Sequence, residues 1–164
     1  MSEPAVRSAT KWESPLGEII LAASTVGLCG LWFAGQRYAP STTTWPRDAE
    51  DPLLRGAILE LEEFFAKRRS SFDVPLDMTS GTPFQRSVWT ALRHIPTGNT
   101  ATYGEIAARI DRPEAVRATA AAIGRNPLSI VVPCHRVIGS DGSLTGYAGG
   151  IDRKAALLAL EGAR

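Results

Sequence analysis

The sequence predicts a mixed α/β (α+β) fold, in which a small N-terminal sheet-plus-helix domain (residues 1–78) precedes a mostly helical domain (residues 79–164). Short apolar runs punctuated by glycine, a pattern typical of strands, dominate the first part. Short helical patterns, opened by capping signals, dominate the second part. The 164 residues, 44% of them apolar, are enough to build a hydrophobic core.

The first domain is expected to contain a hairpin covered by a helix. The apolar runs "GEIILAAS" and "GLCGLWFAG" are separated by the turn-like "STVG". The segment 51–69 offers Asp51 as the N-cap and Pro52 at the first helical position. Its apolar residues share one helix face: Leu54, Ile58, Leu61 and Phe65. Residues 72–78 alternate as a strand would, and "TSGT" at 79–82 marks the boundary between the domains.

The second domain is expected to contain a helix-turn-helix. Thr82 and Gln85 form a capping box that starts a first helix. "TYGEIAARI" has the same capping pattern, with Thr102 and Glu105, and predicts the first helix of the motif. This helix must end before Pro113 because proline interrupts a helix. Residues 113–123 then form the second helix of the motif, with Pro113 at its start and Gly124 as its stop. Small side chains keep the surface of this helix thin: Ala118, Ala120, Ala121 and Ala122.

The segment "SIVVPCHRVIG" (residues 129–139) places a thiol, an imidazole and a guanidinium at the end of an apolar run that has the pattern of a buried strand. The loop that follows holds five glycines between Gly139 and Gly150, which let the backbone approach a ligand closely or turn sharply. A final helix is expected after this loop, with Asp152 as its N-cap.

Charge and cysteine content narrow the function classes. Residues 1–80 hold 8 basic and 11 acidic side chains, a charge of −3, whereas residues 81–164 hold 10 and 6, a charge of +4. The basic half can attract a polyanion, although cations so widely spread are commonly just a solvated surface.

Two cysteines support neither a metal cluster nor a disulfide framework. The N-terminus lacks the apolar stretch of a signal peptide, and no apolar run reaches the roughly 20 residues of a membrane span, so a cytoplasmic protein is expected.

Cys134 and His135 have two interpretations from the residues alone. A cysteine becomes a nucleophile only when a neighbour favours its thiolate, and His135 is adjacent in sequence. On a regular strand the two side chains would point to opposite faces, so His135 would need an irregular backbone or a bridging water to reach the thiol. The alternative is that both are ordinary core residues. Cys29, in "GLCGLWF" with no histidine or arginine nearby, is interpreted as a core residue.

Four segments between residues 81 and 161 resemble the catalytic domain of the O6-alkylguanine-DNA alkyltransferases. They are "GTPFQRSVWTALRHIPTGNTATYGEIA", "AVRATAAAIGRNP", "IVVPCHRVIG" and "GSLTGYAGGIDRKAALLALE", in that family's order and with compatible spacing. Residues 1 to about 78 resemble the family's N-terminal domain only in general character. These proteins transfer an alkyl group from damaged guanine to their own cysteine, each molecule acting once and without metal or diffusible cofactor.

The resemblance implies a role for each of four catalytic residues. Cys134 would be the alkyl acceptor, His135 would act as a base through a water, and Glu161 would orient the imidazole. Tyr103 would donate a proton or hydrogen bond to N3 of the leaving guanine. From the residues alone, Glu161 is interpreted as a surface carboxylate at a helix end, and Tyr103 as a half-buried packing residue.

The resemblance also implies a DNA interface and a substrate pocket. The helix-turn-helix would enter the minor groove of double-stranded DNA, and Arg117 would occupy the gap left by the extruded nucleotide; otherwise Arg117 is a phosphate contact or a solvated side chain. The remaining residues fall into three groups. Ala118, Thr119 and Ala120 would lie against DNA; Val137, Tyr147, Ala148, Gly149 and Lys154 would line the guanine pocket; Asn126 would hold the helix-turn-helix against the active-site segment.

Several points remain open in the resemblance. Lys154 would assist proton transfer, although a lysine near a helix start is commonly solvated, and Arg136 is interpreted as a buried structural guanidinium rather than a DNA contact. Ala148 stands where many members have serine, and Ala120 where many have glycine, which leaves tolerance for bulky alkyl groups and a secondary action on O4-alkylthymine undecided. A monomer is expected, associated with the nucleoid when bound to DNA.

Three other functions would use parts of the same pattern. An alkyltransferase-like binding module lacks the acceptor cysteine, which Cys134 argues against. A transcriptional sensor would carry a zinc-type cysteine cluster in a fused domain. A thiol hydrolase using Cys134 and His135 would turn over repeatedly and would not need DNA.

Overall fold

The computed structural model describes residues 2–164 and has a mixed α+β architecture, as the sequence predicts. An N-terminal unit carries an antiparallel sheet in the order β1-β2-β3: β1 (Ser8–Ser14), β2 (Gly17–Ala23) and β3 (Leu28–Phe33). The hairpin of β2 and β3 is confirmed. The sequence did not predict β1, because most residues of this edge strand are polar and it has little apolar alternation.

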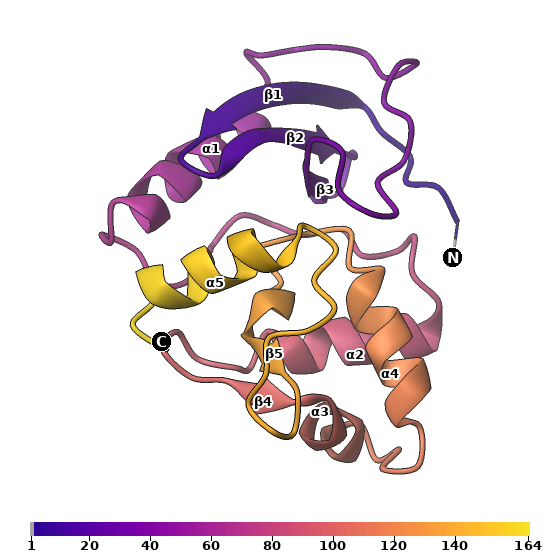
Figure 1. Ribbon diagram of the computed structural model, residues 1–164. Helices are drawn as coiled ribbons and strands as arrows, with labels where there is room; N and C mark the ends of the chain where they lie inside the picture. Colours follow the sequence, from indigo (N-terminus) through magenta and orange to yellow (C-terminus); the bar gives the residue numbers. More distant parts are fainter. Residues whose placement is uncertain (1) are drawn as a thin grey trace.

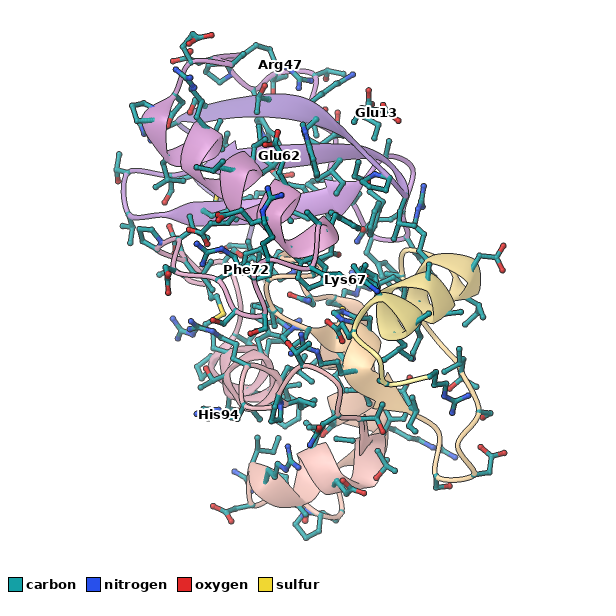
Figure 2. The ribbon with its side chains drawn as sticks, turned by 90° about the vertical axis from the view of Figure 1, so that its left-hand side faces the viewer. Glu13, Arg47, Glu62, Lys67, Phe72 and His94 are labelled. Carbon is teal, nitrogen blue, oxygen red and sulfur yellow. The ribbon has the colours of Figure 1, made fainter. Side chains whose placement is uncertain are left out.

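The helix α1 (Pro52–Phe65) lies across one face of this sheet, as Figure 2 shows. The Asp51 carboxylate caps it by accepting from the backbone N–H groups of Leu53 and Leu54, so the predicted start is confirmed. The buried face is slightly rotated from the predicted one. Its buried residues are Leu54, Ala57, Leu61 and Phe64, whereas Ile58 and Phe65 are half-buried.

The strand predicted over residues 72–78 is wrong. This segment forms only one isolated bridge, between Leu76 and Leu28, in which the Leu28 N–H donates to the Pro75 carbonyl (2.8 Å) and the Asp77 N–H donates to the Leu28 carbonyl (2.8 Å). Pro75 has no N–H to extend a ladder, so the alternation of residues does not become a strand.

A helical unit follows, drawn below the sheet in Figure 1. Its elements are α2 (Pro83–Leu92), β4 (Ala101–Thr102), α3 (Tyr103–Arg109), α4 (Val116–Gly124), the 3-10 turn η1 (Cys134–Arg136), β5 (Val137–Ile138) and α5 (Ile151–Leu160). The capping box of Thr82 and Gln85 is confirmed, with both reciprocal bonds present. The helix-turn-helix of α3 and α4 is confirmed, and the Trp89 indole N–H fixes α4 to α2 by donating to the Ala122 carbonyl (2.8 Å).

Two predicted helix starts are corrected. α4 begins at Val116 rather than at Pro113, because the Ala115 N–H donates to the Arg112 carbonyl and closes a turn that contains the proline. α5 begins after Gly150, whose φ of 95° favours glycine, so Asp152 lies inside the first turn and is not the cap.

The apolar run before Cys134 is not a strand either. Leu128 makes an isolated parallel bridge with Leu31 of β3, and the chain then turns through Ile130, which has a φ of 71°. The run is apolar because it is buried between the two units, not because it is part of a sheet. Within residues 2–164, none of the helices has both the length and the hydropathy that a bilayer span requires.

Candidate functional site

Cys134 opens the 3-10 turn η1, which sets the directions of the three polar side chains of the "PCHR" segment. The Cys134 N–H donates to the Val132 carbonyl (2.8 Å) and the Arg136 N–H to the Pro133 carbonyl (3.0 Å). Successive residues of such a turn point about 120° apart rather than to opposite faces. The backbone is therefore irregular at the place where a regular strand would have separated the thiol from His135.

His135, Arg136 and Glu161 form one buried cluster. His135 Nε2 lies 2.9 Å from Glu161 Oε2, and Arg136 donates to both oxygens of the same carboxylate, from Nε to Oε1 (2.9 Å) and from Nη2 to Oε2 (2.6 Å). The side chains of His135 and Glu161 are almost completely buried. Glu161 is thus not the solvated carboxylate that its place at the end of α5 suggested.

The protonation states of this cluster follow from its geometry. Burial alone would raise the pKa of Glu161, but the hydrogen bonds from His135 and Arg136 outweigh it and lower that pKa to about 2. An ionised carboxylate only accepts, so His135 Nε2 carries the hydrogen and Nδ1 keeps a free lone pair. His135 Nδ1 is buried and has no hydrogen-bond partner among residues 2–164.

Cys134 and His135 are both neutral at rest. Burial lowers the pKa of His135, and the opposing hydrogen bond and charge of Glu161 only partly compensate. Burial raises the pKa of Cys134 above its usual range, although Asn126 and the charge of Lys154 act in the opposite direction. A neutral thiol beside a neutral imidazole needs a proton transfer before it becomes a nucleophile.

Lys154 is buried at 1% exposure, which excludes the solvated alternative. Its Nζ donates to the Thr145 carbonyl (2.8 Å), and burial lowers its pKa to about 8 despite the nearby Cys134. The Tyr103 hydroxyl, at the start of α3, donates to the same carbonyl (3.0 Å). The sequence analysis missed Thr145, because a backbone carbonyl leaves no signal in the amino-acid pattern.

The loop before α5 contributes two buried residues, Tyr147 and Gly149, and the charge of Cys134 acts on the Tyr147 hydroxyl. Tyr147 is buried, and its hydroxyl has no hydrogen-bond partner among the described residues. Gly149 is also buried, and a Cβ built there would come within 2.6 Å of the Tyr147 ring. Ala148 is half-exposed and its carbonyl accepts from the Arg37 N–H (3.0 Å) of the N-terminal unit, while Val137 is fully buried.

The Cys134 thiol is closed off in this conformation. Cys134 is only 6% exposed. A cavity of about 600 Å³ lies on another side of the same segment, where Ile130, Pro133 and Arg136 line it, but Cys134 does not. A ligand therefore reaches the sulfur only if segments around it move.

The residues expected to contact DNA lie on α4, but one of them is buried in this structure. Arg117 and Ala118 are exposed and Ala120 is half-exposed. Thr119 is fully buried, so its side chain cannot contact DNA here. The helical turn points Thr119 toward the core formed with α2 and α3, a direction that its position in sequence did not reveal.

Asn126 links the end of α4 to the segment before Cys134. Its Nδ2 donates to the Val132 carbonyl (2.8 Å), and its Oδ1 accepts from the Leu128 N–H (2.9 Å). Arg125, which the sequence analysis did not single out, stacks over the Tyr38 ring of the N-terminal unit with its Cζ 4.0 Å from the ring centroid. Both contacts fix the helix-turn-helix relative to the rest of the chain.

Cys29 is a core residue, as predicted, and is a free thiol like Cys134. Burial raises its pKa to about 12, which leaves it unreactive at neutral pH. In the part of the chain that the structure describes, no three side chains of histidine, cysteine, aspartate or glutamate come together as metal ligands would.

The chain matches two protein-family models. Residues 9–78 match the ribonuclease-like domain, and residues 83–163 match the DNA-binding domain, of 6-O-methylguanine DNA methyltransferase. A methylated-DNA–protein-cysteine methyltransferase from Mycolicibacterium paratuberculosis is 50% identical over 150 residues, which cover 91% of this chain and 88% of that protein. One from Methanosarcina acetivorans is 49% identical over 152 residues, covering 92% and 96%.

Solved structures show the same similarity. The crystal structure of Mycobacterium tuberculosis OGT in complex with DNA superposes with a TM-score of 0.87 at 46% identity, covering 94% of this chain and 92% of that one. The crystal structure of the O6-methylguanine methyltransferase of the same organism gives a TM-score of 0.86 at 48% identity, covering 96% and 93%.

Proposed function

This chain belongs to the 6-O-methylguanine DNA methyltransferase family, a family of DNA-repair methyltransferases, and on this premise we propose that Cys134 accepts the alkyl group from O6 of guanine in duplex DNA. The transfer is stoichiometric and irreversible. A thioether has no good leaving group and no carbonyl that water can attack, so each molecule works once.

The observation that carries this proposal is the free lone pair of His135 next to Cys134. Glu161 fixes the Nε2–H tautomer, and the unpartnered Nδ1 is the only ring nitrogen left to accept a proton. We expect a water to bridge Nδ1 and the thiol, which would satisfy the orphaned atom. Glu161 stays ionised and stabilises the imidazolium that forms.

The reaction balances with these groups. The thiol proton passes through the water to His135, the Cys134 Sγ–carbon bond forms, and the carbon–O6 bond breaks. The electron pair of that bond stays with guanine, and Tyr103 assists its departure by a hydrogen bond to N3. The proton held by His135 is then passed to the guanine that leaves. The ammonium of Lys154, which counteracts the burial of the thiol, stabilises the developing thiolate.

Nucleotide flipping must precede this chemistry, because O6 lies inside the stacked duplex. The Tyr103 hydroxyl is engaged by the Thr145 carbonyl in this conformation. The loop of residues 139–150 therefore releases Tyr103 and uncovers Cys134 as the base enters, with Val137, Tyr147, Ala148 and Gly149 forming the pocket. In this proposal residues 79–164 are the DNA-binding and catalytic domain, residues 1–78 are the N-terminal domain, and the protein acts as a monomer.

We expect Arg117→Ala to slow repair of duplex DNA about tenfold or more, because an exposed arginine at the start of α4 would fill the place of the extruded nucleotide. The reaction with free O6-benzylguanine, which needs no extrusion, should keep its rate. Single-turnover kinetics with both substrates measure this. Arg55→Ala, an exposed arginine on α1, is the matched control, and equal slowing of both reactions by Arg117→Ala would refute the extrusion role.

The pH dependence of the reaction with free O6-benzylguanine should show an acidic limb below pH 6.5. His135 must be neutral to accept the thiol proton, and burial lowers its pKa below the usual histidine value of about 6.5. A protonated His135 cannot accept the thiol proton. Because its pKa is lowered, the rate is retained at pH 6.5 and is lost only as the pH falls further. A limb centred above pH 6.5 would contradict a buried neutral histidine as the base.

Incubation with a duplex that carries methyl-labelled O6-methylguanine tests the function itself. We expect label on Cys134 in at most one equivalent per molecule. Multiple turnovers would instead indicate a thiol hydrolase, and binding without transfer would indicate a recognition module. The same assay with O4-methylthymine determines whether that base is a second substrate.

A further inference from the structure

The side chain of Thr97 connects the linker between α1 and α2 (residues 66–82) to the buried cluster of His135, Arg136 and Glu161. Thr97 lies in the turn that follows α2. Its hydroxyl donates to the Ser70 carbonyl (2.7 Å) and accepts from Arg136 Nη2 (3.0 Å). Figure 2 views the face on which this linker, marked by Lys67 and Phe72, lies against the helical unit.

The direction of these two bonds fixes the hydroxyl. A threonine hydroxyl has one proton, and the Ser70 carbonyl takes it, so a lone pair remains for Arg136. The branched Cβ restricts rotation of the side chain about χ1. The linker, 27 residues away in sequence, thus decides where the Thr97 acceptor points.

The turn after α2 holds the Arg136 guanidinium at two points. Besides the bond to Thr97, Nη1 donates to the Ile95 carbonyl (2.6 Å). The remaining bonds, from Nε and Nη2, go to the two oxygens of Glu161. A guanidinium is planar, so anchoring one side of it sets the plane in which the carboxylate is held. Glu161 Oε2 is also the atom that accepts from His135.

We propose that Thr97 is a positioning residue for alkyl transfer, which, oriented by Ser70 of the linker, holds Arg136 in the plane that fixes Glu161 against His135. The inference rests on the proposed function, because it requires His135 to act as the base. Thr97 touches neither the substrate nor the thiol. It makes the geometry of the catalytic cluster depend on the linker from the N-terminal unit.

Thr97→Val, which removes the hydroxyl with little change of volume, should lower the rate of alkyl transfer from free O6-benzylguanine about fivefold, the size expected for one lost hydrogen bond. Thr97→Ser should restore the rate to within about twofold of the wild type. Thr90→Val, at an exposed threonine on α2, is the matched control and should have no effect. Thermal unfolding of each variant checks that the fold is kept.

The pH profile separates positioning from a merely structural role. The charged and titratable groups around His135 are Glu161, Arg136, Lys154 and Cys134. Glu161 favours protonation of His135, whereas Arg136 and Lys154 oppose it. A loosely held Glu161 favours it less, so the acidic limb should move to lower pH in Thr97→Val and return in Thr97→Ser.

A double substitution tests the route of the effect. In a Glu161→Gln background, Thr97→Val should not lower the alkyl transfer rate further, because the carboxylate through which Thr97 acts is gone. An unchanged rate and acidic limb in Thr97→Val, or an effect that adds in full to that of Glu161→Gln, would overturn the inference. If the wild type itself transfers no alkyl group to Cys134, the proposed function fails instead, so the two failures are distinguishable.

Discussion

Cys134→Ser is expected to abolish alkyl transfer. Single-turnover incorporation of label from O6-methylguanine DNA should fall by at least about 1000-fold. A serine hydroxyl is far less acidic than a thiol, and oxygen displaces carbon from an ether-like oxygen much more slowly than sulfur does. Binding of the lesion-containing duplex should be kept, because α4 and its exposed residues are not altered.

Cys29→Ser is the control for this substitution, since it makes the same atomic change at the other buried cysteine. Cys29 lies in β3, away from the cluster of His135 and Glu161, so its variant should still take up one equivalent of label. Peptide mapping then assigns the label to Cys134. Label that persists in Cys134→Ser, or that is lost in both variants, contradicts the assignment of the acceptor.

Glu161→Gln should damage both stability and activity. The buried Arg136 guanidinium would lose its charged partner, a loss that typically costs about 3–5 kcal/mol for a broken buried pair. For a chain of this size, the unfolding midpoint should fall by roughly 6–20 °C. The alkyl transfer rate should fall on the order of 100-fold or more, because the amide neither fixes the His135 tautomer nor stabilises the imidazolium.

Two further variants separate these effects. Glu62→Gln, an exposed carboxylate on α1 that Figure 2 labels, should change neither the unfolding midpoint nor the rate. The double variant Arg136→Met with Glu161→Met removes both buried charges and should recover much of the stability but none of the activity. Full activity in the double variant would contradict a role for Glu161 in the reaction.

Local rules explain why so much of the fold was predictable. The Asp51 cap, the Thr82–Gln85 capping box and the helix-turn-helix depend on hydrogen bonds between residues a few positions apart, and short sequence patterns record such bonds directly. The predictions failed where the partner was distant. Residues 72–78 and the run before Cys134 have strand-like patterns, but their apolar residues pack against the core, and each segment makes only one isolated bridge to β3.

The sequence by itself determined the two-part architecture, the helix starts set by side-chain caps and the chemistry available at "PCHRV", because these depend on residue types and near-neighbour spacing. Only the tertiary structure decided that Cys134 is closed off, that Lys154 is buried, that Thr119 faces the core and that Arg136 clamps Glu161. Each of these depends on burial or on contacts between segments such as η1 and the end of α5, which lie 25 residues apart in the chain. Burial and distant partners set the pKa values and exposure that make a thiol reactive, and no local pattern contains them.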